Sequence, residues 1–107
     1  MRFNDVIFMQ NFLSWLRKIN MHYFDYDASV IFEKNEIEQV AYYVSYLDEM
    51  GFTITTPPRE NDFVYMTVIF DKENREYLVQ KPVFKTMLQS YIHGIEQSVL
   101  IIKARRK

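Results

Sequence analysis

The spacing of apolar residues changes along the chain, and this change is the strongest constraint on what the chain can fold into. Three segments repeat apolar residues at every third or fourth position, a spacing typical of amphipathic helices. A central stretch alternates instead, which is typical of β-strands. The chain has 107 residues, a length that suits one domain. We therefore expect residues 1–107 to form a single α+β domain.

The three segments with helical spacing are residues 4–20, 35–50 and 82–103. Asn4 is a suitable N-cap for the first helix, because its side chain can accept a hydrogen bond from a free backbone N–H group. Asn35 and Glu38 have the spacing of a capping box at the start of the second helix. Gly51 can adopt the left-handed conformation that often ends a helix. Pro82 suits the first turn of the third helix, where no N–H group is needed.

The segments that alternate are residues 52–56, 62–70 and 76–80, and they predict a three-stranded antiparallel sheet. Residues 28–32 are rich in β-branched and aromatic side chains and are a candidate fourth short strand. Both faces of the strand at 62–70 are apolar, so we expect neither face to be freely solvated. The predicted order is helix, candidate strand, helix, three strands and helix, with the three helices packed mainly on one face of the sheet.

Small residues and a basic end distinguish the last predicted helix. Gly94 and Ser98 lie four positions apart, which would let another backbone approach this helix closely. Residues 103–107 contain four Lys or Arg residues, and we expect them to form a frayed basic tail.

The composition excludes several classes of site. The chain has no cysteine, which excludes disulfides, thiolate nucleophiles and cysteine-ligated zinc. With only two glycines it has no glycine-rich phosphate-binding loop, and it contains none of the usual catalytic motifs. We expect neither a cofactor nor an enzyme. No signal peptide is visible and no apolar run approaches the ~20 residues of a membrane span, so the expected location is the cytoplasm.

One string of potential metal ligands is present. His22, Asp25 and Asp27 offer an imidazole and two carboxylates, which are competent ligands for zinc, iron or manganese. The sequence places no fourth ligand beside them, and loops that contain three such residues are common. A metal-dependent enzyme is therefore the least favoured of the functions considered.

Surplus apolar residues favour a role in protein–protein interaction. They lie outside the main apolar stripe of the second predicted helix or on the second face of the long strand, and they are Tyr43, Tyr46, Met50, Phe63, Tyr65 and Ile69. Tyr and Met provide large, adaptable contact surfaces. We expect a non-enzymatic protein that buries this surface in a partner protein or in a homodimer.

The composition also bears on the origin of the chain. Phe, Tyr, Met, Ile, Asn and Lys, whose codons are AT-rich, are abundant, whereas Gly is scarce. A short chain of this kind suits an inhibitor or modulator encoded by a phage or another mobile element, and this hypothesis is an association with composition alone.

Nucleic-acid binding is the alternative. A net charge of −1 disfavours a globally basic binder, but cationic side chains in loops and near the end of the chain could contact phosphates. These are Arg59, Lys72, Arg75, Lys81, Lys85, Lys103, Arg105, Arg106 and Lys107. The predicted order of elements in residues 35–103 resembles a double-stranded RNA-binding domain, and the passage from helix to strand at 46–52 resembles a winged helix. These resemblances imply a small transcriptional regulator, although the helix at 35–50 carries no Lys or Arg.

Overall fold

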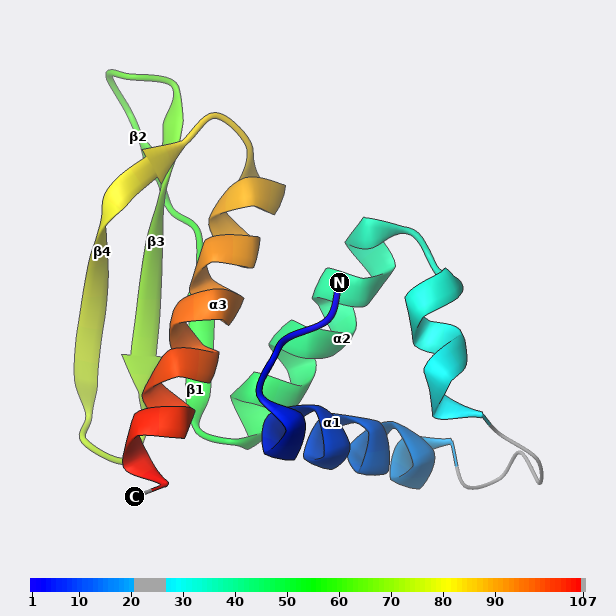
Figure 1. Ribbon diagram of the computed structural model, residues 1–107. Coiled ribbons are helices and arrows are strands. Elements are labelled where there is room, and N and C mark those ends of the chain that lie inside the picture. Colours follow the sequence, from blue (N-terminus) through cyan, green and yellow to red (C-terminus); the bar gives the residue numbers. More distant parts are fainter. Residues whose placement is uncertain (21–26, 107) are drawn as a thin grey trace.

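Residues 1–20 and 27–106 are the part of the chain that the structure, a computed structural model, describes. They form three α-helices, a short 3-10 helix and four antiparallel strands, so the expected α+β class is confirmed (Figure 1). In chain order the elements are α1 (Val6–Ile19), η1 (Ala28–Glu33), α2 (Glu36–Glu49), β1 (Phe52–Thr55), β2 (Pro58–Arg59), β3 (Val64–Asp71), β4 (Glu76–Phe84) and α3 (Met87–Arg105). Figure 1 shows the helices on one side of the sheet, with α3 nearest to the strands and α1 and η1 farther out.

β3 is the central strand of the sheet. β4 pairs along one of its edges, whereas β1 and β2 pair one after the other along the opposite edge. Phe52 of β1 lies opposite Asp71, and Pro58 of β2 lies opposite Tyr65. β1 and β2 therefore act as one edge strand that is interrupted by two residues, and β2 supplies the fourth short strand.

The prediction of a strand at 28–32 is wrong, because these residues belong to the 3-10 helix η1. The Asp27 carboxylate accepts hydrogen bonds from the backbone N of Ser29 at 2.9 Å and from the Ser29 hydroxyl at 2.7 Å. This cap starts a helical turn in which Ala28 and Ile31 are fully buried. Capping and burial together outweigh the β preference of the local sequence.

The start of the last helix also differs from the prediction, since Pro82 lies in β4 and not in α3. Thr86 caps α3, and its hydroxyl accepts a hydrogen bond from the backbone N of Gln89 at 3.1 Å. Pro82 falls within an irregularity in the pairing of β4 with β3, at the outer edge of the sheet. Proline is tolerated at such a bulge because no N–H group is needed there. β4 therefore continues to Phe84, beyond its predicted end at Gln80.

Two predicted helix boundaries are confirmed, and a third moves by one residue. The Asn35 side chain accepts a hydrogen bond from the backbone N of Glu38 at 2.9 Å, as the capping pattern predicts. Gly51 has a φ of 105°, the left-handed conformation expected after α2. Asp5, and not Asn4, caps α1 with its carboxylate.

α3 approaches the strands most closely at Gly94. A methyl group placed on Gly94 would come within 2.6 Å of the Ile54 side chain of β1, so glycine alone fits without movement. The Ser90 hydroxyl donates to the Met66 carbonyl oxygen of β3 at 2.9 Å. The buried Ser98 hydroxyl donates to the carbonyl oxygen of Gly94 at 2.7 Å, within the helix. The predicted close approach is found at Gly94, although strand side chains and not a backbone come closest to it, and Ser98 is buried.

Asp71, at the end of β3, is a buried carboxylate (1% exposed) that ties the β3–β4 turn to α3. It accepts hydrogen bonds from the backbone N of Glu73 at 3.1 Å and from both the backbone and the side chain of Asn74. The Arg105 guanidinium of α3 donates to the same carboxylate. This bond to Arg105 is the largest reason why the pKa of Asp71 lies below its usual value.

We predict that Gly94→Ala lowers the free energy of unfolding by about 1–3 kcal/mol, because the added methyl group would overlap the Ile54 side chain. Helix propensity alone would make the same substitution stabilising by about 1 kcal/mol, so the sign of the change separates the two effects. Urea unfolding followed by circular dichroism measures it. A more stable variant would contradict the close packing of α3 on the sheet.

We predict that Asp71→Asn lowers the free energy of unfolding at neutral pH by roughly 1.5–3 kcal/mol, because it weakens a charge-assisted hydrogen bond. The pKa of Asp71 is lower in the folded chain than in the unfolded chain. The wild-type advantage is therefore complete above the ordinary carboxyl pKa and is lost as the pH falls through the folded value. Urea unfolding measured between about pH 7 and pH 2 should show the two proteins converging in acid.

The matched control is Glu73→Gln, which removes an exposed carboxylate from the same turn and should change stability little. If the free energies of unfolding of wild type and Asp71→Asn differed by the same amount down to the lowest pH, ionisation of the Asp71 carboxyl would not be the source of the stability difference.

Candidate protein interface

Three of the six residues predicted to form a binding surface are buried in the core, and this part of the prediction is wrong. Tyr43, Tyr46 and Ile69 are each at most 5% exposed. The Tyr43 ring stacks on Phe12 of α1 with 4.1 Å between the ring centroids, and its hydroxyl donates to the Met1 carbonyl oxygen at 2.8 Å. Burial raises the pKa of Tyr43 well above its usual value.

These tyrosines are buried because α2 is covered on two sides. Its main apolar stripe faces α3, while its second stripe, which carries both tyrosines, packs against α1. Phe8, Phe12 and Leu16 of α1 form the other half of this aromatic cluster. Ile69 is buried because it lies on the face of β3 that α3 covers. The two tyrosines are not needed where the helices cover the sheet. They are used instead in a separate interface between α1 and α2.

The other three predicted residues lie at the surface, but on different elements. Met50 is exposed at the end of α2. Tyr65 is half-buried near the start of β3, whereas Phe63 is 90% exposed in the loop that precedes this strand. The structure therefore does not gather the six residues into one surface.

The sheet has one face that no described helix covers (Figure 1). In β3 the buried residues alternate with partly exposed ones, which point away from α3. Antiparallel pairing places Val79 opposite Val68 and Tyr77 opposite Phe70 on this side. We call the following side chains the open sheet face: Val64, Met66, Val68 and Phe70 of β3 and Tyr77, Val79 and Val83 of β4.

The open sheet face is apolar and widely accessible. Tyr77 is 70% exposed and Val79 is 58% exposed. The rings of Tyr77 and Phe70 lie beside each other with 4.7 Å between their centroids. None of the seven side chains is charged at neutral pH. The β1–β2 edge of the same side is polar, because pairing places Thr53 opposite Phe70 and Arg59 opposite Val64. Contiguous apolar sets are more common at interaction sites than elsewhere on protein surfaces, whereas single exposed apolar residues are ordinary.

Sequence reasoning chose the wrong side of the long strand as the binding surface. The alternation in residues 62–70 shows that both faces of that strand are apolar. The predicted binding residues Tyr65 and Ile69 lie on the side that α3 covers, and none of the seven residues of the open sheet face was among those predicted. Which side the helices cover depends on how they pack, and the alternation of apolar residues does not show this.

A second apolar surface lies between α2 and the first turns of α3, and we call it the α2–α3 groove. Its volume is about 520 Å³. It is lined by Ile37, Val40, Ala41, Val44 and Ser45 of α2 and by Met87, Leu88 and Tyr91 of α3. Ile37 is 68% exposed, and Met87 is also exposed. Such a lining suits an apolar side chain better than a polar ligand.

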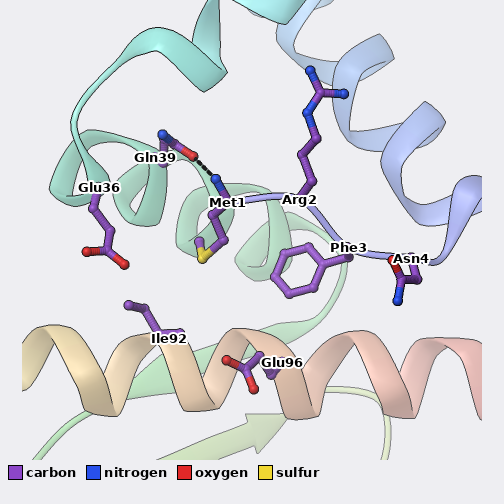
Figure 2. A pocket seen from close by; sticks show the side chains of 8 residues that line it. All are labelled: Met1, Arg2, Phe3, Asn4, Glu36, Gln39, Ile92 and Glu96. Atoms are coloured by element: carbon purple, nitrogen blue, oxygen red, sulfur yellow. Dashed lines mark hydrogen bonds between the residues drawn. The ribbon is translucent and has the colours of Figure 1, made fainter.

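A third hollow is polar and lies where the first four residues cross α2 and α3 (Figure 2). Its volume is about 570 Å³. The Met1 ammonium donates to Gln39 Oε1 at 2.6 Å, and Glu36 and Glu96 line the hollow from two different helices. Arg2 turns away, with its guanidinium over an aromatic ring of η1. Two carboxylates do not complete the six or more oxygen ligands that calcium needs.

His93 on α3 is a titratable group with an incomplete environment. Its Nε2 is buried without a hydrogen-bond partner among the described residues, and its ring lies against Phe84. Glu96 lines the same small hollow of about 260 Å³, but no hydrogen bond joins it to His93 there. The described residues thus give His93 no orienting partner of the kind that a general base uses.

Four of the nine cationic residues predicted to contact nucleic acid pair with carboxylates. The pairs are Arg59 with Asp62, Lys72 with Asp48, Arg105 with Asp71 and Arg106 with Asp5. Since α3 continues to Arg105 and Arg106 binds Asp5, the frayed tail predicted at 103–107 is ordered through Arg106. The exposed candidates are spread over a turn, β4, a loop and α3, and they are Arg75, Lys81, Lys85 and Lys103. Lys107 lies outside the described residues.

Two of the three predicted metal ligands, His22 and Asp25, lie outside the described residues. Asp27 is described, and hydrogen bonds from Ser29 lower the pKa of its carboxyl. Its role as the cap of η1 accounts for its position. Within residues 1–20 and 27–106, no three His, Asp or Glu side chains form a group that could hold a metal ion.

Comparison of the chain with family models, with curated proteins and with solved structures found no match. No helix in the described residues is both long enough and apolar enough to cross a bilayer. The functional argument therefore depends on the surfaces of the chain itself.

We predict that Tyr43→Ala lowers the free energy of unfolding by about 3–5 kcal/mol, because it removes a buried ring from the aromatic cluster. Tyr77→Ala, at an exposed position of the open sheet face, should change stability by only about 0.5 kcal/mol. Urea unfolding of both variants measures the contrast. Similar losses for the two tyrosines would contradict the assignment of Tyr43 to the core and of Tyr77 to the surface.

Proposed function

We propose that the protein is a non-enzymatic interaction protein that acts by burying its open sheet face against another protein surface, with a second copy of the chain as the first candidate partner. The observation that carries this proposal is the apolar side of the sheet that no described helix covers. The proposed function is still protein–protein interaction, as predicted from the sequence. The proposed binding surface is now on β3 and β4 and no longer includes Tyr43 and Tyr46, which are buried.

The energetic argument concerns water at the open sheet face. Burying apolar surface yields about 25 cal/mol per Å², and aromatic side chains such as Tyr77 offer the largest areas. Monomeric proteins rarely leave large contiguous apolar patches in water, because covering them with a partner is favourable. A strongly exposed Tyr77 next to Phe70 provides an anchor of the kind that dominates protein interfaces.

A second copy is a suitable partner for two reasons. The seven apolar side chains of the open sheet face carry no charge, and Arg59, the cation that pairing places beside Val64, is already paired with Asp62. Two identical faces can therefore meet around a two-fold axis with little repulsion. The chain as a whole has a net charge of −1, so long-range repulsion between copies is weak. Two sheets packed face to face lie about 10 Å apart, a spacing that side chains such as Val, Met and Phe fill.

Nucleic-acid binding has less support, because four of its nine candidate cations are already bound to carboxylates. A role as inhibitor or modulator, an origin in a phage or mobile element and a cytoplasmic location follow from composition alone, and they stay predictions.

We predict that Val79→Lys weakens self-association, because it places a charge in the middle of the open sheet face. Sedimentation over a range of concentrations should give a wild-type mass above that of the 13.0 kDa chain and a lower mass for the variant. The matched control is Ile7→Lys, which adds the same charge at an exposed apolar position of α1. Equal masses for Val79→Lys and wild type at every concentration would remove the open sheet face from self-association.

A further inference from the structure

Phe63, in the loop between β2 and β3, combines a strained backbone conformation with a solvent-exposed aromatic ring. Phe63 has a φ of 53°, in the left-handed region that residues with bulky side chains rarely adopt. Its side chain is also 90% exposed, so the ring contacts almost nothing in its own chain. Strained residues of this kind persist at functional sites, where the strain holds a side chain in position for a ligand or partner.

Arg75 in the β3–β4 turn provides an internal comparison. It has nearly the same φ, 52°, and it is also exposed. Arg75 carries a charge that water solvates, so turn geometry explains it without further assumptions. Phe63 combines the same backbone with an apolar ring in water, and the ring is what needs an explanation.

We propose that Phe63 is an anchor that inserts into the α2–α3 groove of a second copy of the chain. The groove is apolar, measures about 520 Å³ and is open at Ile37 and Met87. Methionine and aliphatic side chains adapt well to an aromatic ring, so this lining suits the phenyl group of Phe63. The chain therefore contains both an exposed apolar anchor and an apolar receptor.

Anchor and receptor lie at the same end of the molecule. Figure 1 shows the β2–β3 connection projecting beyond the first turn of α3, and α2 begins at this same end. The groove lies between α2 and the first turns of α3. Two copies that meet end to end around a two-fold axis can therefore each insert one anchor into the other, which closes the assembly as a dimer.

One pair of charges beside the two elements is complementary, on the α3 side of the groove, whereas the exposed Glu36 adjoins Ile37 on the α2 side. Glu60 lies in the same loop as Phe63, and Lys85 lies two residues before Met87, which lines the groove. Both side chains are exposed, and neither forms an ion pair within the described part of the chain. A reciprocal contact would bring Glu60 of one copy toward Lys85 of the other, which favours this occupant of the groove.

This contact goes beyond the proposed function, because it uses the helix side and one end of the molecule and leaves the open sheet face free. The experiment is therefore carried out in the Val79→Lys protein, whose open sheet face is blocked. In that protein we expect a concentration-dependent dimer with twice the mass of the 13.0 kDa chain. A strictly monomeric Val79→Lys protein would overturn the anchor while leaving the open-face contact intact.

Phe63→Gly tests the anchor, because this substitution should make the folded chain more stable while it weakens the dimer. Glycine adopts a positive φ without strain, so the urea midpoint should rise while the dissociation constant of the dimer increases at least about tenfold. Arg75→Gly is the matched control, since it should raise the urea midpoint as well but leave the dissociation constant unchanged. Equal dissociation constants for Phe63→Gly and Arg75→Gly would overturn the proposal.

Mixing two variants tests whether the receptor is the groove of a second copy. Ala41 lines the groove and is exposed, so Ala41→Arg should fill the groove without disturbing the helix. In the Val79→Lys background, Phe63→Gly and Ala41→Arg should each be monomeric alone, because each homodimer would lack every anchor or every receptor. An equimolar mixture should form a heterodimer, since one intact anchor then meets one intact groove. No dimer in the mixture would overturn the exchange between copies.

Discussion

The close packing of α3 on the sheet at Gly94 determines much of the rest of the structure. The helix covers one side of β3, where the Ser90 hydroxyl binds a strand carbonyl oxygen and Gly94 lies against the Ile54 side chain. The other side of the strands is left to solvent, and their apolar residues on that side form the open sheet face. α2 packs against the flank of α3, which creates the groove between the two helices. Both surfaces that we assign to binding thus follow from the position of one helix.

The aromatic residues of the chain are divided between two uses. One group fills the interface of α1 and α2, where Phe8, Phe12, Tyr43 and Tyr46 form stacked and edge-to-face pairs. This cluster packs α1 onto α2, while α2 itself also contacts β1 and α3. Others, of which Phe63 is the most exposed, lie outside any core. A high aromatic content is therefore not by itself evidence of a binding surface.

The sequence was sufficient for features that depend on local chemistry and periodicity. The three helices, the capping by Asn35, the turn at Gly51 and the close approach at Gly94 could all be predicted from neighbouring residues. Features that depend on distant contacts could not. The exposure of Tyr43 was misjudged because nothing near α2 shows that α1 packs against its second stripe, and Pro82 was misplaced because a bulge depends on the partner strand. The prediction of the binding surface was wrong for the same reason, since the exposure of a side chain depends on the assembled fold.

The pair formed by Asp5 and Arg106 has a consequence for how the chain folds during synthesis. Arg106 donates two hydrogen bonds of 2.9 Å to the carboxylate that caps α1, and the two residues are 101 positions apart. While the protein is being made, the first helix has its cap but lacks the cation that neutralises it until Arg106 has been added. The contact between α1 and the end of α3 can therefore form only after both helices and the whole sheet between them in sequence have been translated.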